Sequence, residues 1–291
     1  MDIIKPVFII GTGRCGSSLL FNVLSKHPNV AFLSNICDKY PKAPSLNRLA
    51  MQLYDLGVIN KVIEKKIVPS EAYSFWDCYA PEFSNPHRDL VGSDVRVNVK
   101  NSLRKTIAAM LTRKRSRLLV KITGWPRISY LKEIFPDALF IHMLRDGRAV
   151  ANSFLNLNIS WWTGWMGPEN WKWGELPTEY QKEWKKYNQS YIALAAILWK
   201  ILMDAFELAK NFLSQNQLLE IRYEDLVQNP VAVLKKTIKF SELNWDKKFE
   251  KRIRQIEIRN ANHKWKEQLT SSQQRILQEC LEGHLNKYGY G

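Results

Sequence analysis

Short apolar runs recur along the chain and alternate with segments in which apolar residues have helical spacing. Such runs, about four to eight residues long and bounded by turn residues, are typical of buried strands. Strands that alternate with helices predict a parallel sheet with helices on both faces. The predicted strands are residues 7–10, 28–33, 118–122, 139–144 and 218–221. The predicted helices follow the first strand and cover residues 46–63, 102–111, 126–135, 146–155, 187–213 and 270–285, whereas residues 34–44 and 75–94 are predicted as loops.

A glycine-rich loop joins the first predicted strand to the first helix. Gly11 and Gly16 have the G-x-x-x-x-G spacing of a phosphate-binding loop, and the hydroxyls of Ser17 and Ser18 follow. Free amides of such a loop and of a helix N-terminus bind anions. Lysine is absent from the position after Gly16, where loops that bind nucleoside triphosphates carry it, and the positive charge is Arg14 instead. The pattern favours a nucleotide with a 5′-phosphate-linked group over triphosphate hydrolysis, with a plain strand–turn–helix as the alternative.

Charge and composition narrow the class of protein. The 291 residues carry 43 basic and 28 acidic side chains, a formal net charge of +15, which favours an anionic ligand or partner. Nucleic acid would fit the charge, but the sequence has no zinc-finger spacing, RNA-binding aromatic motif or basic tail. No linker or repeat divides the chain, so we expect one domain over residues 1–291.

Cysteine spacing and hydropathy bear on metal sites and location. The four cysteines are scattered, with no C-x-x-C, so the sequence predicts neither a metal site nor a disulfide framework. Free cysteines are typical of cytoplasmic proteins. No leader pattern and no apolar run of about 20 residues is present, so we expect a cytoplasmic enzyme without stable membrane association.

The loop and the residues after it, GTGRCGSSLL and LSKHPNV, resemble the 5′-phosphosulfate loop of sulfotransferases that use 3′-phosphoadenosine 5′-phosphosulfate (PAPS). The likeness is to the bacterial, carbohydrate- and tyrosylprotein-like branch, which has R-x-G-[ST]-[ST] where cytosolic hormone enzymes have a lysine loop. It implies a P-loop-like three-layer α/β fold. It also implies sulfuryl transfer from PAPS to a hydroxyl or amine of a small-molecule acceptor, a natural product or a sugar. The implied ligands of the 5′-phosphosulfate are Gly13, Arg14, Cys15, Gly16, Ser17 and Ser18, with Arg14 also catalytic.

A second stretch, FIHMLRDGRAVANSF, resembles the family at the end of the fourth predicted strand. Arg145 and Ser153 have the spacing of the family residues that bind the 3′-phosphate. Eight residues along a helix separate them by about 12 Å, a gap that a long arginine side chain could bridge in part. The alternative is an arginine paired with Asp146 or Glu133.

Two later segments also resemble the family. Tyr223 in RYEDLVQNP matches a tyrosine near the adenine, although Tyr-Glu-Asp could simply begin a helix. NHKWKEQL resembles the C-terminal loop that covers the cofactor, which implies a role for Lys264, Trp265 and Lys266 in closing over the nucleotide.

The residue that accepts the proton is not fixed by the resemblance. Lys121, at the end of the third predicted strand, matches a lysine that faces the transferred group and is taken as catalytic. Cytosolic members have a histidine two residues later, where this chain has Thr123. Other members use a glutamate soon after the first helix, where the nearest carboxylate is Asp38. Asp38 is therefore the first candidate for the general base, followed by His87 and Asp94.

Several tryptophans lie close together in a segment at about residues 156–186: Trp161, Trp162, Trp165, Trp171 and Trp173. We expect an acceptor-side insertion in which these rings either line the acceptor pocket or anchor a small core.

Two other functions stay open: a P-loop kinase or NTPase, which needs a lysine after Gly16, and a basic nucleic-acid binder. The sequence does not identify the acceptor, does not distinguish O- from N-sulfation, and leaves the oligomeric state open.

Overall fold

A five-stranded parallel sheet lies at the centre of the computed structural model, which describes residues 2–55, 65–84, 88–157, 176–256 and 258–291. The strand order is β2-β3-β1-β4-β5, and every neighbouring pair is parallel. All five strands coincide with the apolar runs of the sequence, to within about two residues at each end. The strands are β1 (Val7–Gly11), β2 (Val30–Phe32), β3 (Arg117–Thr123), β4 (Leu139–Leu144) and β5 (Leu218–Arg222).

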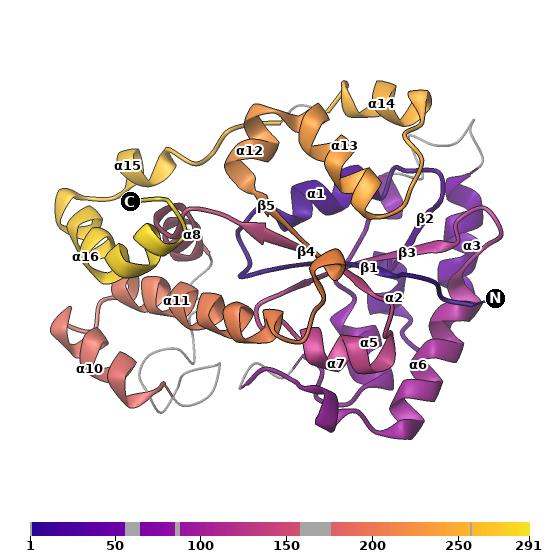
Figure 1. Cartoon of the computed structure of the whole chain (residues 1–291), viewed down its shortest axis with the longest axis horizontal. Coiled ribbons are helices and arrows are strands. Elements are labelled where there is room, and N and C mark those ends of the chain that lie inside the picture. Colours follow the sequence, from indigo (N-terminus) through magenta and orange to yellow (C-terminus); the bar gives the residue numbers. More distant parts are fainter. Residues whose placement is uncertain (1, 56–64, 85–87, 158–175, 257) are drawn as a thin grey trace.

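Helices cover both faces of the sheet, as the alternating pattern predicts (Figure 1). Helices α1, α12 and α13 lie on one side and α5, α6 and α7 on the other. The bounds are α1 (Ser17–Leu24), α2 (Asn35–Lys39), α3 (Pro44–Tyr54), α5 (Tyr73–Tyr79), α6 (Val97–Met110), α7 (Ile128–Ile134), α8 (Gly147–Leu155), α10 (Thr178–Lys186), α11 (Tyr191–Lys210), α12 (Tyr223–Gln228), α13 (Pro230–Phe240), α14 (Lys247–Ile253), α15 (Lys264–Gln268) and α16 (Ser271–Lys287).

The register of the sheet brings the loops after β1, β3 and β4 together. Every residue of β1 and β4 is buried, as expected for central strands covered on both faces. Gly11 pairs with Thr123 and Ile10 with His142, so the carboxyl ends of the three strands share one edge. Ligands of open parallel sheets bind at that edge.

Two segments predicted as loops contain helices. Residues 34–44 include α2, whose N-cap Ser34 accepts a hydrogen bond from the amide of Ile36. Residues 75–94 include most of α5, where Phe75 and Trp76 are fully buried. Aromatic burial in the core therefore outweighs the polar, proline-rich character of the surrounding sequence. None of the helices in the described part of the chain has the length and apolar character needed to cross a bilayer.

A separate hydrophobic cluster, built mainly from α8, α11 and α16, fixes the helix that follows β4. Gly147 is the first residue of α8 and lies against the buried ring of Trp199 on α11. A Cβ at Gly147 would be 2.8 Å from that ring, closer than atoms can pack. Only glycine therefore lets α8 start this close to α11.

We expect Gly147→Ala to lower the free energy of unfolding by about 1–3 kcal/mol, because the added methyl group overpacks the contact with Trp199. Urea denaturation measures the change. Gly283→Ala is the matched control, since Gly283 lies within α16 and nothing stands within 4 Å of its would-be Cβ. There alanine should raise the free energy of unfolding by about 0.5–1 kcal/mol. Equal changes in the two variants would contradict this packing account.

Candidate active site

The loop between β1 and α1 has a strongly turned backbone. Gly13 and Gly16 have positive φ angles of 81° and 89°, and Arg14 between them has φ 54°, an uncommon conformation for a residue with a side chain. Glycine at position 16 is also required by packing, because a Cβ there would lie 2.4 Å from the ring of Tyr223. The loop thus presents its amides, with those that begin α1, at the carboxyl edge of the sheet.

Arg14 joins the two sequence motifs. Arg145 follows β4, and its Nη1 donates a 2.8 Å hydrogen bond to the carbonyl oxygen of Arg14. The side chain of Arg14 in turn donates from Nε to the hydroxyl of Ser153, at 2.9 Å. Arg14 therefore stands between Arg145 and Ser153, whereas the sequence analysis expected the Arg145 side chain to bridge part of the gap. Arg145 thus contacts the backbone of Arg14, and the guanidinium of Arg14 contacts Ser153.

Arg145 is buried beneath a second layer of contacts. Its guanidinium lies 4.3 Å from the ring centroid of Tyr223, a cation–π distance, and burial lowers its pKa from the usual arginine value. Nε donates to Oδ1 of Asn262 at 3.1 Å, and Nη2 donates to the carbonyl of Ala261 at 3.1 Å. The hydroxyl of Tyr223 donates to the carbonyl of Arg259 at 3.1 Å. Tyr223 and the segment 258–262 therefore enclose Arg145 beside the loop.

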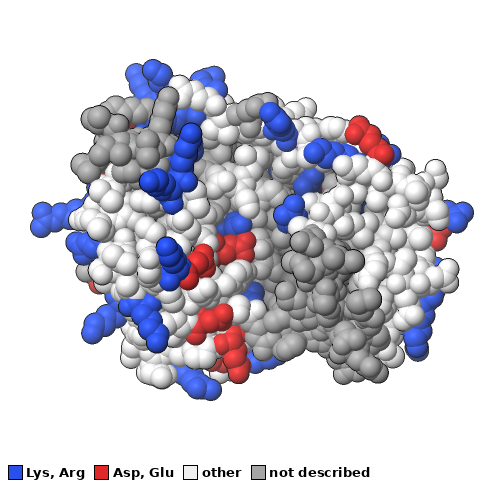
Figure 2. Space-filling model, turned by 180° about the vertical axis from the view of Figure 1, so that it is seen from behind, with Lys and Arg blue, Asp and Glu red and all other residues white. Residues whose placement is uncertain are grey.

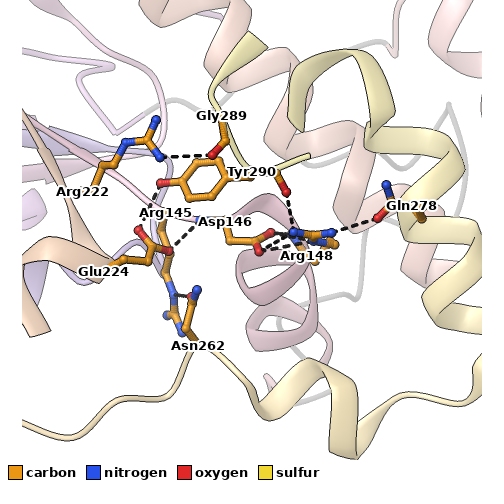
Figure 3. A network of polar contacts seen from close by, with 9 residues as sticks. All are labelled: Arg145, Asp146, Arg148, Arg222, Glu224, Asn262, Gln278, Gly289 and Tyr290. Carbon is orange, nitrogen blue, oxygen red and sulfur yellow. Dashed lines mark hydrogen bonds and ion pairs between the residues drawn. The ribbon is translucent and has the colours of Figure 1, made fainter. Parts of the chain in front are cut away.

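A network of polar contacts holds the backbone around Arg145 (Figure 3). Glu224 accepts from the amide of Asp146 at 3.2 Å through one oxygen and from the hydroxyl of Tyr290 at 3.1 Å through the other. Arg148 pairs with Asp146 at 2.9 Å and donates to the carbonyl of Tyr290 at 2.6 Å. Figure 3 shows the ring of Tyr290, in the segment after α16, pointing toward Glu224 of α12, and its carbonyl oxygen facing Arg148 of α8. These contacts hold the backbone on the C-terminal side of Arg145 in place.

A cavity of about 650 Å³ opens beside the loop and contains a carboxylate that the sequence did not single out. The carboxylate of Glu71 forms an ion pair with Nζ of Lys121 at 2.6 Å and accepts a hydrogen bond from the hydroxyl of Thr123 at 3.0 Å. Lys121 also donates to the hydroxyl of Ser18 at 2.8 Å. Thr123 is held in turn, because Tyr73 donates to its carbonyl oxygen at 2.9 Å. A carboxylate, an ammonium and the loop hydroxyl thus converge at one point.

Two of the three candidates for the general base from the sequence, Asp38 and Asp94, do not line this cavity. Asp38 is on α2, does not line this cavity, and accepts a hydrogen bond from Ser70. Asp94 forms a two-fold hydrogen-bonded ion pair with Arg88, at 2.7 Å for each contact. His87 falls outside the described residues. This placement argues against Asp38 and Asp94 as the proton acceptor.

Glu71 escaped the sequence analysis because a tertiary contact brings it to the site. An antiparallel bridge between Ser34 and Pro69 places residues 69–71 beside the chain that follows β2. Glu71 thus reaches the cavity from a segment well beyond the first helix, where the sequence analysis named no candidate. Residues 56–64, between α3 and this bridge, lie outside the described part of the chain.

The remaining predicted residues are Cys15, the three residues of the expected nucleotide cover, and the tryptophans of the expected insertion. Cys15 is fully buried, and burial raises the pKa of its thiol, so its contribution to the loop comes from the backbone. Trp265 is buried, with the guanidinium of Arg148 4.9 Å from its ring centroid, and it joins α15 to α8 away from the cavity. Lys264 and Lys266 are exposed on α15. The five tryptophans of the expected insertion lie outside the described residues, and the described aromatic wall of the cavity is Tyr73, Trp125 and Phe154.

Positive charge is spread over the described part of the face seen in Figure 2 and does not gather in a single patch. Lysine and arginine side chains lie mostly around its margin, and acidic side chains stand nearer its middle. A continuous basic track, as expected for nucleic acid, is not seen on the described residues of this face.

Comparisons with known proteins point to one family. A family model described as "Sulfotransferase family" matches residues 6–247. Protein-tyrosine sulfotransferase A of Caenorhabditis elegans is 31% identical over 119 residues, which are 41% of this chain and 25% of that protein. Omega-hydroxy-beta-dihydromenaquinone-9 sulfotransferase Stf3 of Mycobacterium tuberculosis is 25% identical over 193 residues, 66% of this chain and 46% of that protein. The chain thus spans less than half the length of either curated relative.

Solved structures show the same fold. Sulfotransferase STF9 from Mycobacterium avium superposes with a TM-score of 0.61 at 15% identity, covering 99% of this chain and 77% of that one. The sulfotransferase domain from the curacin biosynthetic pathway superposes with a TM-score of 0.52 at 15% identity, covering 100% of this chain and 99% of that one. The expected P-loop-like α/β architecture is confirmed.

Proposed function

The chain belongs to the sulfotransferase family, and from this premise we propose that it moves the sulfuryl group of PAPS to a hydroxyl or amine of a small-molecule acceptor. One observation carries the proposal. The loop after β1 contacts Arg145 through the carbonyl of Arg14, and the Lys121–Glu71 pair contacts the hydroxyl of Ser18 just after the loop. The arginines suit the two anionic groups of the nucleotide, and the Lys121–Glu71 pair suits the attacking hydroxyl of the acceptor.

The nucleotide fits the arginine side of the loop. Loop amides, Arg14 and the hydroxyls of Ser17 and Ser18 bind the 5′-phosphosulfate, because fixed N–H and guanidinium donors suit sulfate and phosphate oxygens. Arg145 and Ser153 bind the 3′-phosphate, which replaces part of the hydrogen bonding that now links them through Arg14. The adenine lies toward Tyr223, and exposed Lys264 and Lys266 are placed near enough in sequence to the enclosing segment 258–262 to act as its outer cover.

The transfer is an in-line displacement at sulfur. The acceptor enters the 650 Å³ cavity, and Glu71 takes the proton of its hydroxyl or amine while the new bond to sulfur forms. The bond between sulfur and the bridging oxygen breaks, and its electron pair stays on the 5′-phosphate of the departing 3′,5′-adenosine bisphosphate. Arg14 and Lys121 stabilise the charge that develops on the bridging and sulfuryl oxygens, while Thr123 and Lys121 orient the carboxylate.

Three further expectations accompany this proposal. The chain acts as one domain over residues 1–291, with the acceptor-side segment at about 156–186 lying mostly outside the described residues. We keep a cytoplasmic location as part of the proposal. The kinase and nucleic-acid alternatives are not favoured, because Ser17 follows Gly16 and the described basic side chains of the visible face are scattered.

The test is PAPS turnover. Purified protein is incubated with sulfur-labelled PAPS and pooled phenols, alcohols and amines, and the release of 3′,5′-adenosine bisphosphate is followed together with label transfer. We expect at least one pool to give acceptor-dependent release with label in the acceptor. Magnesium-dependent ATP hydrolysis without any labelled acceptor would favour the kinase or NTPase function instead.

A further inference from the structure

A second cavity shares lining residues with the candidate active site. It has a volume of about 640 Å³ and is lined by residues of α1, among them Phe21, and by Ser25 just after that helix. Ser18 and Lys121 line both this cavity and the active-site cavity. Because Lys121 donates to the hydroxyl of Ser18 at 2.8 Å, that contact is a shared wall of the two cavities.

The lining of the second cavity has a basic part and an apolar part, called here its basic and apolar sides. Lys26, Lys65 and Lys121 line it, and its described lining residues include no acidic side chain. Lys121 is paired with Glu71, but within the described residues the ammonium groups of Lys26 and Lys65 have no ion-pair or hydrogen-bond partner. The apolar side is formed by Phe21, Tyr54, Val68 and Pro69. An organic anion with a ring or short hydrocarbon body matches both sides.

We propose that this second cavity binds an anionic group of the acceptor, carried on an aromatic or aliphatic body, while the acceptor's nucleophile reaches past Lys121 toward Glu71. The inference rests on the proposed function and deepens it, because it names the class of acceptor. The carboxylate, sulfonate or phosphate of such an acceptor contacts Lys26 and Lys65, and its body packs on Phe21 and Tyr54. A free inorganic anion shares the contact with the lysines but gains nothing from the apolar side.

Calorimetric titration of the full chain saturated with 3′,5′-adenosine bisphosphate tests the inference. The probes are 2-naphthoate, its neutral isostere 2-naphthamide, and inorganic phosphate. We expect 2-naphthoate to bind about tenfold more tightly than 2-naphthamide, since two charge-assisted contacts distinguish them. Inorganic phosphate should bind more weakly than 2-naphthoate, because it leaves the apolar side uncovered.

Matched variants locate the binding site. Lys26→Met with Lys65→Met keeps much of the apolar stem of each lysine and should abolish the preference for 2-naphthoate. Lys105→Met with Lys239→Met removes the same charge from exposed positions that line neither cavity, and should keep the preference. An unchanged preference in the first double variant, or equal affinity of the two naphthalene probes for the wild type, would overturn the inference.

The remaining outcomes separate this inference from the proposed function. Phosphate that binds as tightly as 2-naphthoate would replace the acceptor subsite by a site for free anions. Failure of 3′,5′-adenosine bisphosphate to bind the wild type would remove the proposed function itself. Tight nucleotide binding without any preference between the naphthalene probes would overturn the acceptor subsite alone.

Discussion

Glu71→Gln should lower kcat by about 10²–10⁴-fold, the usual contribution of a positioned general base, with nucleotide affinity unchanged. Glutamine keeps the shape of the side chain and can still accept from Lys121 and Thr123 at one oxygen. It cannot take the proton of the acceptor. The rate is measured as release of 3′,5′-adenosine bisphosphate with an acceptor that the wild type sulfates, and the affinity by calorimetry.

Asp38→Asn is the control for this prediction. The Asp38 carboxylate supports Ser70, the residue before Glu71, but does not line the cavity. We therefore expect a kcat within about threefold of the wild type, because only the support of the loop changes. A large loss of kcat in Asp38→Asn together with an active Glu71→Gln variant would assign the proton transfer to Asp38.

Arg14→Ala should lower kcat by about 10²–10³-fold, the loss seen when a fixed donor to developing charge is removed. The same change should weaken nucleotide binding, because it removes the guanidinium that contacts Ser153. The backbone carbonyl of residue 14, which accepts from Arg145, is kept in the variant. Single-turnover kinetics at saturating PAPS separate the chemical step from binding.

Arg14→Lys distinguishes charge from geometry at this position. Lysine keeps the positive charge but lacks the planar pair of donors, so part of the activity should return relative to alanine. Since residue 14 has φ 54° in the wild type, alanine and lysine meet the same backbone constraint there, which makes the two variants comparable. A wild-type kcat in Arg14→Ala would remove the assigned role of this residue.

The sequence was sufficient for the sheet and for the nucleotide side of the site. The central strands β1 and β4 were visible as apolar runs because they are buried on both faces of the sheet. The loop and Arg145 were visible because their chemistry depends on residues close together in sequence, or on a strand end whose place in the sheet is fixed. Gly147 and Gly16 are required by contacts with Trp199 and Tyr223 that only the folded chain supplies.

The acceptor side depended on contacts that sequence patterns do not encode. Glu71 reaches Lys121 through the bridge between Ser34 and Pro69, and no periodicity marks that bridge. The packing of Trp265 against Arg148 was equally hidden, because a tryptophan in a polar segment fits a cover for the nucleotide and a buried anchor alike. Long-range packing decides such cases.

The most direct measurement is calorimetric titration of the wild type and of Arg145→Ala with 3′,5′-adenosine bisphosphate, with 5′-AMP and ATP as controls. The account predicts that the wild type prefers the bisphosphate to 5′-AMP by at least about tenfold, because Arg145 and Ser153 bind the 3′-phosphate. In Arg145→Ala that preference should disappear while 5′-AMP still binds, which also shows that the variant is folded. Equal affinity of the wild type for the bisphosphate and 5′-AMP, or a preference for ATP, would contradict the account.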